Sequence, residues 1–332
     1  MQHESGLPKM RVCLAGNFVP HPDEGVRKIA SCIGRELKTR HDVLEIRTKD
    51  FRAWREARAF RPDILHFVLS PTTPGLAAAR LLSCYCPKAK TVVSAPQAAL
   101  LVARGILPLF KPDLVLYQSH DSERMFNKLG FASDFLPNGV DVDEFTPFSA
   151  EERLALRQRY GIPPDKFVIV HVGPVKEGRN IRRLKELQGN GNQVLIVGRP
   201  SESGESGLNQ ELSRAGCLVW TRYLPDIREV YGLSDCYVFP TTRAVSCIES
   251  PLSVLEAMSC NIPVVSTRFG ALPRLFQDGD GFSFVDNAEE FPARVQSLKH
   301  NDRPVRTREK VLPFSWKEIT ARLESIYSSL LK

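Results

Sequence analysis

The chain has 332 residues, of which 42% are hydrophobic and 25% charged, a composition typical of globular proteins that excludes a largely disordered or fibrous chain. At roughly 150 residues per domain, this length predicts two domains, each large enough to bury its own core. Lys and Arg number 45 against 38 Asp and Glu, a net charge of +7. This modest excess, without a basic run or a recognised binding motif, predicts no nucleic-acid partner.

Eight cysteines lie within apolar segments, which predicts reduced, buried thiols in a cytosolic protein. They are Cys13, Cys32, Cys84, Cys86, Cys217, Cys236, Cys247 and Cys260. Cys84 and Cys86 are too close for an ordinary metal pair, and no second pair follows at zinc spacing, so no metal site is expected. Residues 1–9 lack the apolar segment of a secretory signal, and no apolar run approaches the ~20 residues that span a bilayer. We therefore expect a cytoplasmic protein, either free or bound at the inner face of the cell membrane.

In the first half of the chain, short β-rich runs alternate with amphipathic helical stretches. The expected strands are 12–16, 43–46, 64–69, 91–94 and 114–117, and the expected helices are 25–40, 54–60, 76–84 and 122–129. This alternation predicts an α/β fold with a parallel sheet covered by helices.

The alternation breaks between residues 135 and 165, where prolines cluster around a short charged helix, and a second series follows. Its expected strands are 167–172, 193–197, 236–239 and 263–266. We therefore predict two doubly wound, Rossmann-like domains, 1–147 and 148–314, facing across a cleft in which the ligand binds. Residues 315–332 are expected to form an amphipathic helix that packs back on the first domain.

The segment from Val172 to Asn180 leaves a strand, crosses two glycines with Lys176 and Arg179, and is expected to enter a helix at Asn180. Glycine lets backbone amides approach a ligand closely, and the start of a helix favours an anion, so the loop suits a phosphate. An ordinary strand-to-helix turn with solvated charges is the alternative.

A second segment, 244–258, also suits an anion. Pro251 fits the first turn of a helix, whose free amides at Leu252 and Ser253 would face a negative charge. Glu256 would lie about one turn further on, where a carboxylate can accept hydrogen bonds from vicinal hydroxyls such as those of a ribose. Alternatively, Glu249 and Glu256 are surface carboxylates on either side of a helix start.

The stretch from Glu249 to Gly270 resembles the retaining glycosyltransferases of family four, which have the two-domain GT-B fold. The stretch from Pro137 to Phe145 looks like the hinge-proximal motif of the same family. The resemblance implies a nucleotide-sugar donor held mainly by the second domain. It also implies a hydroxyl acceptor on a glycan, lipid or small molecule, held by the first domain.

The resemblance further implies that the amides of Leu252 and Ser253 bind the donor diphosphate and that Glu256 holds the ribose. The family's phosphate-loop Lys falls on Arg179 and its Arg on Pro174, so Lys176 is the candidate for the missing charge. These cations would stabilise the departing diphosphate, a role that requires no metal. Gly16, Gly173 and Arg199 complete the expected donor-binding residues.

The sequence departs from the family in two places. The family commonly has two Glu residues with seven others between them, but Ile248 occupies the earlier position and Glu249 leaves only six. We expect the Glu249 carboxylate to contact the transferred sugar. The family's first-domain His is replaced within the stretch Ser94 to Gln97, so Gln97 is the acceptor-side candidate. His66, in an apolar strand, is a weaker candidate because such a histidine is typical of a core.

The positive charge is concentrated in residues 25–61, which carry eleven Lys or Arg and five Asp or Glu. Four arginines recur at every third position of a helix that also carries Phe51, Trp54 and Phe60. They are Arg52, Arg55, Arg58 and Arg61. This pattern predicts peripheral contact with an anionic membrane, with a solvated basic face as the alternative.

The expected function is therefore a retaining hexosyltransferase-type enzyme that moves a sugar from a nucleotide donor to a hydroxyl. The donor is a substrate, and no cofactor is expected. The donor phosphate itself would take the acceptor's proton, as the resemblance implies. Two alternatives remain: a sugar-nucleotide epimerase on the same scaffold, and a non-catalytic protein that binds sugar nucleotides.

Overall fold

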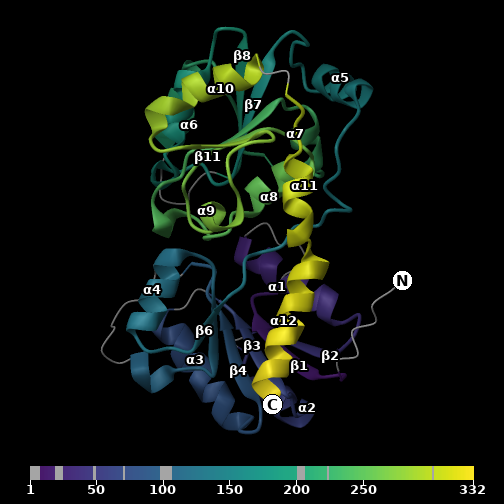
Figure 1. Cartoon of the computed structure of the whole chain (residues 1–332), viewed down its shortest axis with the longest axis vertical. Coiled ribbons are helices and arrows are strands. Elements are labelled where there is room, and N and C mark those ends of the chain that lie inside the picture. Colours follow the sequence, from purple (N-terminus) through teal and green to yellow (C-terminus); the bar gives the residue numbers. More distant parts are fainter. Residues whose placement is uncertain are drawn as a thin grey trace. The chain divides into compact units, whose positions relative to one another are not determined.

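A computed structural model describes residues 8–18, 25–47, 50–69, 72–97, 107–199, 206–222, 224–300 and 303–332 of the chain. The chain divides into two compact units. The first unit comprises Met1–Gly139, Ile248–Ser250 and Trp316–Lys332, and the second comprises Val140–Cys247 and Pro251–Ser315. Each unit is built on a six-stranded sheet (Figure 1).

The sheet of the first unit is parallel throughout and has the strand order β2-β1-β3-β4-β5-β6. Its strands are β1 (Arg11–Gly16), β2 (Asp42–Arg47), β3 (Ile64–Val68), β4 (Lys90–Ser94), β5 (Leu114–Tyr117) and β6 (Ser133–Phe135). The strand order reverses between β1 and β3. That position is the topological switch point of a doubly wound sheet.

Helices cover both faces of this sheet, which explains why its interior strands are apolar on both sides. They are α1 (Gly25–Leu37), α2 (Phe51–Phe60), α3 (Thr73–Tyr85), the 3₁₀ helix η2 (Leu107–Phe110), α4 (His120–Lys128) and α12 (Trp316–Leu331). Side chains of α2, α3 and α4 share one core cluster with Cys13 and Ala15 of β1. On the opposite face, α12 packs against α1.

The C-terminal helix α12 buries a stripe of side chains at helical spacing, namely Ile319, Leu323 and Tyr327. On the same helix, Glu324 is 1% exposed, and its carboxylate lies 3.0 Å from Arg40 and 3.2 Å from His41. Apolar burial and these charged contacts together hold α12 on the first unit.

The sheet of the second unit is also parallel and has the order β12-β11-β10-β7-β8-β9. Its strands are β7 (Phe167–Val172), β8 (Asn192–Val197), β9 (Leu218–Trp220), β10 (Cys236–Phe239), β11 (Val264–Thr267) and β12 (Phe282–Val285). Here the order reverses between β7 and β10.

Twelve helical segments belong to the described part of the second unit. The α-helices are α5 (Ala150–Arg159), α6 (Ser206–Arg214), α7 (Arg228–Gly232), α8 (Leu252–Ser259), α9 (Leu272–Leu275), α10 (Phe291–Lys299) and α11 (Thr307–Val311). The 3₁₀ helices are η3 (Glu177–Arg179), η4 (Ile181–Leu187), η5 (Ala244–Ser246), η6 (Ala288–Glu290) and η7 (Leu312–Phe314).

The predicted fold class of two Rossmann-like domains is confirmed by these two sheets and their helices. The observed division lies at Gly139/Val140, earlier in the chain than the expected boundary after residue 147, and the three residues Ile248–Ser250 belong to the first unit. The helix expected from Asn180 is instead the 3₁₀ segment η4. Asn180 has a φ of 60°, a left-handed conformation that asparagine tolerates and that interrupts the helix there.

The basic helix α2 also differs from the prediction in one respect. Its arginines Arg52, Arg55 and Arg58 are exposed as expected. Trp54, however, is 6% exposed and joins the core cluster with Ala53 and Ala57. An α-helix turns once in 3.6 residues, so an apolar stripe at 53, 54 and 57 faces the core while the arginines face outward. Trp54 therefore lies on the core side of α2 and is not part of its basic face.

The cysteines are free, and seven of the eight are buried as predicted, the exception being the exposed Cys84. Burial raises the pKa of the Cys13 thiol to about 12 and that of Cys217 to about 11, so both stay protonated. In the part of the chain that the structure describes, no helix has the length and apolar character needed to cross a membrane.

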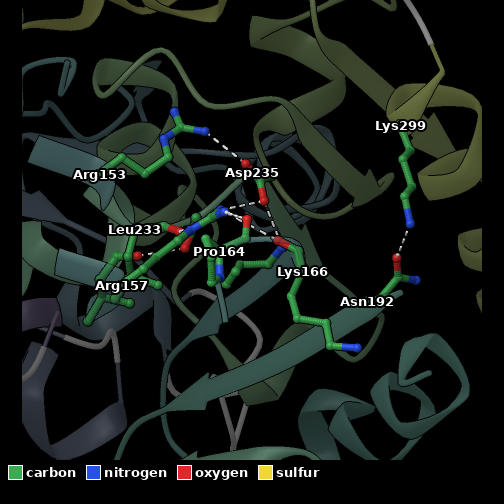
Figure 2. Close-up of polar contacts among 11 residues, drawn as sticks. Arg153, Arg157, Pro164, Lys166, Asn192, Leu233, Asp235 and Lys299 are labelled. Carbon is green, nitrogen blue, oxygen red and sulfur yellow. Dashed lines mark hydrogen bonds and ion pairs between the residues drawn. The ribbon is translucent and has the colours of Figure 1, made fainter. Parts of the chain in front are cut away.

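A buried arginine joins α5 to the sheet of the second unit (Figure 2). Arg157 is 7% exposed and donates to the Leu233, Pro164 and Lys166 carbonyls and to the Asp235 carboxylate. Asp235 also accepts from Arg153 and from the amide of Val168 at the start of β7. The guanidinium therefore satisfies three carbonyls and a carboxylate at one point, where α5 meets β7 and the start of β10.

Removal of this guanidinium should destabilise the second unit. An Arg157→Met variant leaves Asp235 partly buried without its main partner, and we expect a loss of about 2–3 kcal/mol in the free energy of unfolding. Urea denaturation measures it. Arg159→Met is the matched control, because Arg159 forms an exposed ion pair with Glu229 and its loss should change stability much less. Equal losses in the two variants would contradict this role of Arg157.

Candidate functional site

The two loops predicted to suit an anion lie at the switch point of the second sheet. One follows β7, which ends at Val172, and the other lies between β10, which ends at Phe239, and α8. The carboxyl ends of the strands at such a reversal are where doubly wound sheets bind ligands. The sheet itself therefore brings the two predicted segments to one place.

The glycine of the first loop allows a close approach between two backbone segments. Gly173 has a φ of 153° and donates its amide to the Val197 carbonyl at 2.8 Å. A Cβ on the neighbouring Gly198 would lie 1.8 Å from the Gly173 oxygen, so no larger residue fits there. Arg199 follows Gly198 and is exposed, and its backbone carbonyl accepts a hydrogen bond from the Val175 amide at 3.0 Å. These contacts fix the loop directly after β7.

Arg179 folds back over this loop. Its Nε donates to the Ser246 carbonyl of η5 at 3.2 Å. A Cβ placed on Gly173 would lie 2.3 Å from Arg179 Nη1, so the guanidinium occupies the space that glycine leaves open. Lys176 is half-buried at the start of η3, three residues before Arg179. The predicted cations thus lie on one short loop.

A neutral histidine lies behind Arg179. His171 is fully buried on β7, and its Nδ1 lies 2.9 Å from the Val238 carbonyl, to which it donates. Burial, and in smaller part the charge of Arg179, lower the pKa of His171 to about 4. The imidazole therefore carries no charge near neutral pH, so His171 adds no positive charge behind Arg179.

The second loop leads into α8, where Ser253 and Glu256 are three residues apart and share a face. Glu256 is 7% exposed and accepts a hydrogen bond from the Tyr231 hydroxyl at 2.8 Å. The Tyr237 hydroxyl donates to Ser253 Oγ at 2.7 Å and lies 3.4 Å from the Val172 carbonyl. Tyr237 therefore places the first turn of α8 beside the end of β7.

Amides in the first turn of a helix have no acceptor within the helix, and α8 begins at Leu252. The amides of Leu252 and Ser253, the Ser253 hydroxyl and the loop that carries Arg179 thus form a cationic, donor-rich surface. Such a surface binds phosphate groups.

Glu249 lies in the other unit. The segment Ile248–Ser250 runs across the carboxyl ends of β4, β5 and β6 in the first unit. The Glu249 amide donates to the Pro96 carbonyl at 2.7 Å, and the Ser250 amide donates to Gln118 Oε1 at 3.2 Å. Asn138 Nδ2 donates to the Ser250 carbonyl at 2.7 Å. Each of the three strands is thus followed by a residue that holds this segment.

The carboxylate of Glu249 is 4% exposed and accepts a hydrogen bond from the Ser122 hydroxyl. Gln97 directly follows Pro96, so the structure brings Glu249 and Gln97 together in the first unit. The supporting residues Gln118 and Ser122 were not predicted from sequence. The position of Gln118 directly after β5 was the available signal, because polar residues that follow parallel strands gather at one edge of the sheet.

The prediction of an acceptor contact at His66 is corrected by the structure. The ring is fully buried, with Nδ1 2.6 Å from the Tyr327 hydroxyl and Nε2 2.8 Å from Ser94 Oγ. Both ring nitrogens are therefore used inside the first unit. Burial lowers the pKa of His66 to about 3, as expected for a neutral core residue.

Gly16 ends β1 at the switch point of the first sheet and is buried against Ala30. Residues 19–24 of the loop that begins at Gly16 lie outside the described residues, as do residues 98–106 after Gln97.

The family model described as Glycosyl transferases group 1 matches residues 167–301, which include β7 to β12 of the second unit. The second unit is therefore similar to the group 1 glycosyltransferases over these residues. The predicted resemblance to the glycosyltransferases is confirmed by this match.

Among curated proteins, the chain is 27% identical over 232 residues to the putative teichuronic acid biosynthesis glycosyltransferase TuaC of Bacillus subtilis. The alignment covers 66% of this chain and 56% of that relative. It is 25% identical over 203 residues to the sulfoquinovosyl transferase SQD2 of Arabidopsis thaliana, covering 56% of this chain and 38% of the relative. The chain thus spans about 38% to 56% of the length of these two relatives.

Solved structures extend the similarity to both units. Alr3699/HepE of Anabaena in complex with UDP superimposes with a TM-score of 0.79 at 15% identity, covering 96% of this chain and all of the other. A glycosyltransferase from Rickettsia africae superimposes with a TM-score of 0.77 at 15% identity, covering 98% and 99% of the two chains. At this identity the likeness shows the fold, which is that of the GT-B glycosyltransferases.

The burial of His66 predicts a pH dependence of stability. Its pKa is about 3 when folded and 6.5 when unfolded, so below pH 6.5 the unfolded chain binds a proton that the folded chain does not. Neutral, buried His66 therefore contributes to the free energy of unfolding at neutral pH, and this contribution is lost as the pH falls from 6.5 towards 3. By pH 5 this loss is about 2 kcal/mol.

Urea denaturation at pH 7 and pH 5 tests this prediction in the wild type and in His66→Gln, whose amide can still bond Tyr327 and Ser94 without titrating. The wild type should lose about 2 kcal/mol more than the variant over this interval. The same loss in both proteins would show that His66 does not titrate as the structure implies.

Proposed function

We propose that the protein is a retaining, metal-independent glycosyltransferase that moves a sugar from a nucleotide donor to a hydroxyl group. The observation that carries the proposal is the meeting of the Gly173 loop and the first turn of α8 at the switch point of the second sheet. The similarity to the group 1 glycosyltransferases over residues 167–301, which contain both elements, supports it. HepE, whose structures contain UDP and glucose, shares the fold and supports a nucleotide-sugar donor.

The second unit would hold the donor. The amides of Leu252 and Ser253 bind the diphosphate, while the Glu256 carboxylate accepts hydrogen bonds from the ribose hydroxyls. Lys176 and Arg179 stabilise the negative charge that grows on the diphosphate as its bond to the sugar breaks. Gly173 allows the phosphates to approach the backbone, and Arg199 adds positive charge at the end of β8.

The first unit would hold the acceptor. Its hydroxyl oxygen bonds to the anomeric carbon on the face that the diphosphate leaves, and a donor phosphate oxygen takes the hydroxyl proton. Glu249 contacts the transferred sugar, with its carboxylate oriented by Ser122, and Gln97 donates a hydrogen bond on the acceptor side. In this proposal the protein's own side chains and amides orient the reacting groups, a role that requires no bound metal.

Substitution of the donor residues tests this proposal. UDP, GDP and ADP and their common sugar conjugates are titrated against the wild-type protein by calorimetry. Glu256→Ala and Arg179→Ala should each weaken binding of the preferred nucleotide by about tenfold or more, since each removes a charge-assisted contact. Arg183→Ala is the control, because Arg183 forms an exposed ion pair with Glu186.

Turnover separates the proposed transferase from its rivals. Slow donor hydrolysis without an acceptor, lost in Arg179→Ala, supports a transferase. Epimer formation would identify an isomerase, and binding without turnover would identify a non-catalytic sugar-nucleotide protein. Full activity in both site variants would overturn the site.

We propose in addition that the protein works at the inner face of an anionic membrane and takes a lipid-linked acceptor. Residues 25–61 carry most of the net positive charge, and Arg52, Arg55, Arg58 and Arg61 are exposed. Three exposed apolar side chains lie on the neighbouring segments, namely Leu81 and Tyr85 of α3 and Leu109 of η2. Tyr85 contacts Trp54 of α2 edge-on, so the apolar and basic surfaces adjoin. Such a combination suits an anionic lipid surface.

Vesicle sedimentation tests the membrane contact. A triple Arg→Gln variant at positions 52, 55 and 58 should bind phosphatidylglycerol vesicles at least tenfold less tightly, because each basic residue near the surface contributes about 1 kcal/mol. A control variant neutralises Arg182, Arg183 and Lys185 of the second unit, with the same change in net charge. Equal binding by the two variants would contradict a specific basic surface. Equal binding of the wild type to phosphatidylglycerol and phosphatidylcholine vesicles would contradict it as well.

A further inference from the structure

Two buried tyrosines lie beneath the proposed donor residues of α8. Tyr231 of α7 and Tyr237 of β10 are both 0% exposed, and their ring centroids are 6.2 Å apart. The hydroxyl of Tyr231 lies 2.8 Å from Glu256 Oε2, and that of Tyr237 lies 2.7 Å from Ser253 Oγ. Each proposed polar side chain of α8 thus has its own tyrosine.

The Tyr231 hydroxyl must be the donor to Glu256, because a carboxylate only accepts, and the Tyr237 hydroxyl is the donor in its hydrogen bond with Ser253 Oγ. A serine hydroxyl has one proton and two lone pairs. When Tyr237 donates to Ser253 Oγ, one lone pair is occupied and the Ser253 proton remains available to donate to a ligand. A carboxylate can accept about four hydrogen bonds, so Glu256 can accept from ligand hydroxyls in addition to the Tyr231 hydroxyl. The tyrosines therefore favour Ser253 as a donor and Glu256 as an acceptor.

The tyrosines remain donors over the whole working pH range. Burial is the main cause that raises the pKa of both hydroxyls, and the neighbouring Glu256 charge raises it further. Their rings are also fixed in place, because Tyr231 packs edge-on against Phe145 with centroids 5.9 Å apart. A buried, fixed hydroxyl of this kind orients its partner without reorganisation when a ligand binds.

We propose that Tyr231 and Tyr237 are positioning residues for the donor: Tyr231 orients the Glu256 carboxylate toward the two ribose hydroxyls, and Tyr237 directs the Ser253 proton toward the diphosphate. Neither tyrosine touches the donor itself. This inference rests on the proposed function, because it assigns the same site its hydrogen-bond directions.

The test for Tyr231 combines a variant with a changed ligand. Among UDP, GDP and ADP, the nucleotide that binds the wild type most tightly is compared with its 2′,3′-dideoxy analogue by calorimetry. Tyr231→Phe should weaken the ribonucleotide by about tenfold, the effect of a misdirected hydrogen bond to a charged group. The analogue lacks the hydroxyls that Glu256 binds, so its affinity should change by less than about twofold.

The test for Tyr237 uses the same nucleotide with and without its phosphates. Tyr237→Phe should weaken the nucleoside diphosphate several-fold and leave the free nucleoside nearly unchanged, since Ser253 acts only on the diphosphate. In turnover assays both variants should raise the donor KM with little change in kcat, because the oriented groups hold donor portions that do not react.

Tyr160→Phe is the matched control, because the Tyr160 hydroxyl also donates to a carboxylate, that of Glu229, which is not one of the proposed donor-binding residues. It should leave nucleotide affinity unchanged, and thermal unfolding verifies that all three variants fold. Equal losses for the ribonucleotide and its dideoxy analogue, or no loss at all, would overturn the proposed role of Tyr231. Equal losses of affinity for the nucleoside diphosphate and for the free nucleoside would overturn the proposed role of Tyr237. If no nucleotide binds the wild type, the proposed function itself fails.

Discussion

The parallel pairing of β7 with β10 is the interaction on which the proposed donor site depends. It aligns Tyr237 with Val170, so the ends of the two strands and the segments that follow them meet at one edge of the sheet. Because β8 lies on the other side of β7, the strand order reverses at this pair and leaves the carboxyl ends open to a ligand. The close backbone approach of Gly198 to Gly173 and the reach of Tyr237 to Ser253 both follow from this arrangement.

The first unit has the same architecture, but the residues that follow three of its strands bind a segment of the chain. The residues after β4, β5 and β6 hold Ile248–Ser250, a segment that lies in the chain between two elements of the second unit. Glu249 is thus positioned by Pro96 and Ser122, whereas Glu256 is positioned by Tyr231. The spacing between the two glutamates is therefore not a helical period, since only Glu256 lies on α8.

Interior strands were predicted from sequence almost residue for residue, because strands buried on both faces are continuous apolar runs. The runs 167–172 and 236–239 coincide with β7 and β10. The edge strands β6, β9 and β12 were missed. Two of them, β6 and β9, are three residues long and not fully buried, which is too short to show the run or alternation that marks a strand. Tertiary pairing, which the sequence does not display, makes them strands.

The residues of the candidate site also divide into those that the sequence predicts and those that it does not. Motifs and loop chemistry predicted the proposed donor residues Gly173, Arg179, Ser253 and Glu256, because backbone freedom and helix starts leave a local signature. Residues that are linked to the proposed site only by tertiary contacts, such as Tyr231, Tyr237 and Gln118, were not predicted. His66 was kept as a weaker acceptor-side candidate, because its two partners, Tyr327 and Ser94, are distant in sequence and were not predicted. Similarly, the composition of α2 did not show whether Trp54 faces the core or the solvent, because the helical period decides which face each residue occupies.

Hydrogen exchange of the backbone amides, measured with and without a saturating nucleoside diphosphate, tests whether the second unit binds the donor at the proposed site. Binding at the switch point of the second sheet should slow exchange in the loop 173–179 and in the first turn of α8, because a bound ligand suppresses local opening of the segments that it contacts. Exchange that stays unchanged at both segments, while the nucleotide protects residues elsewhere, would contradict the account.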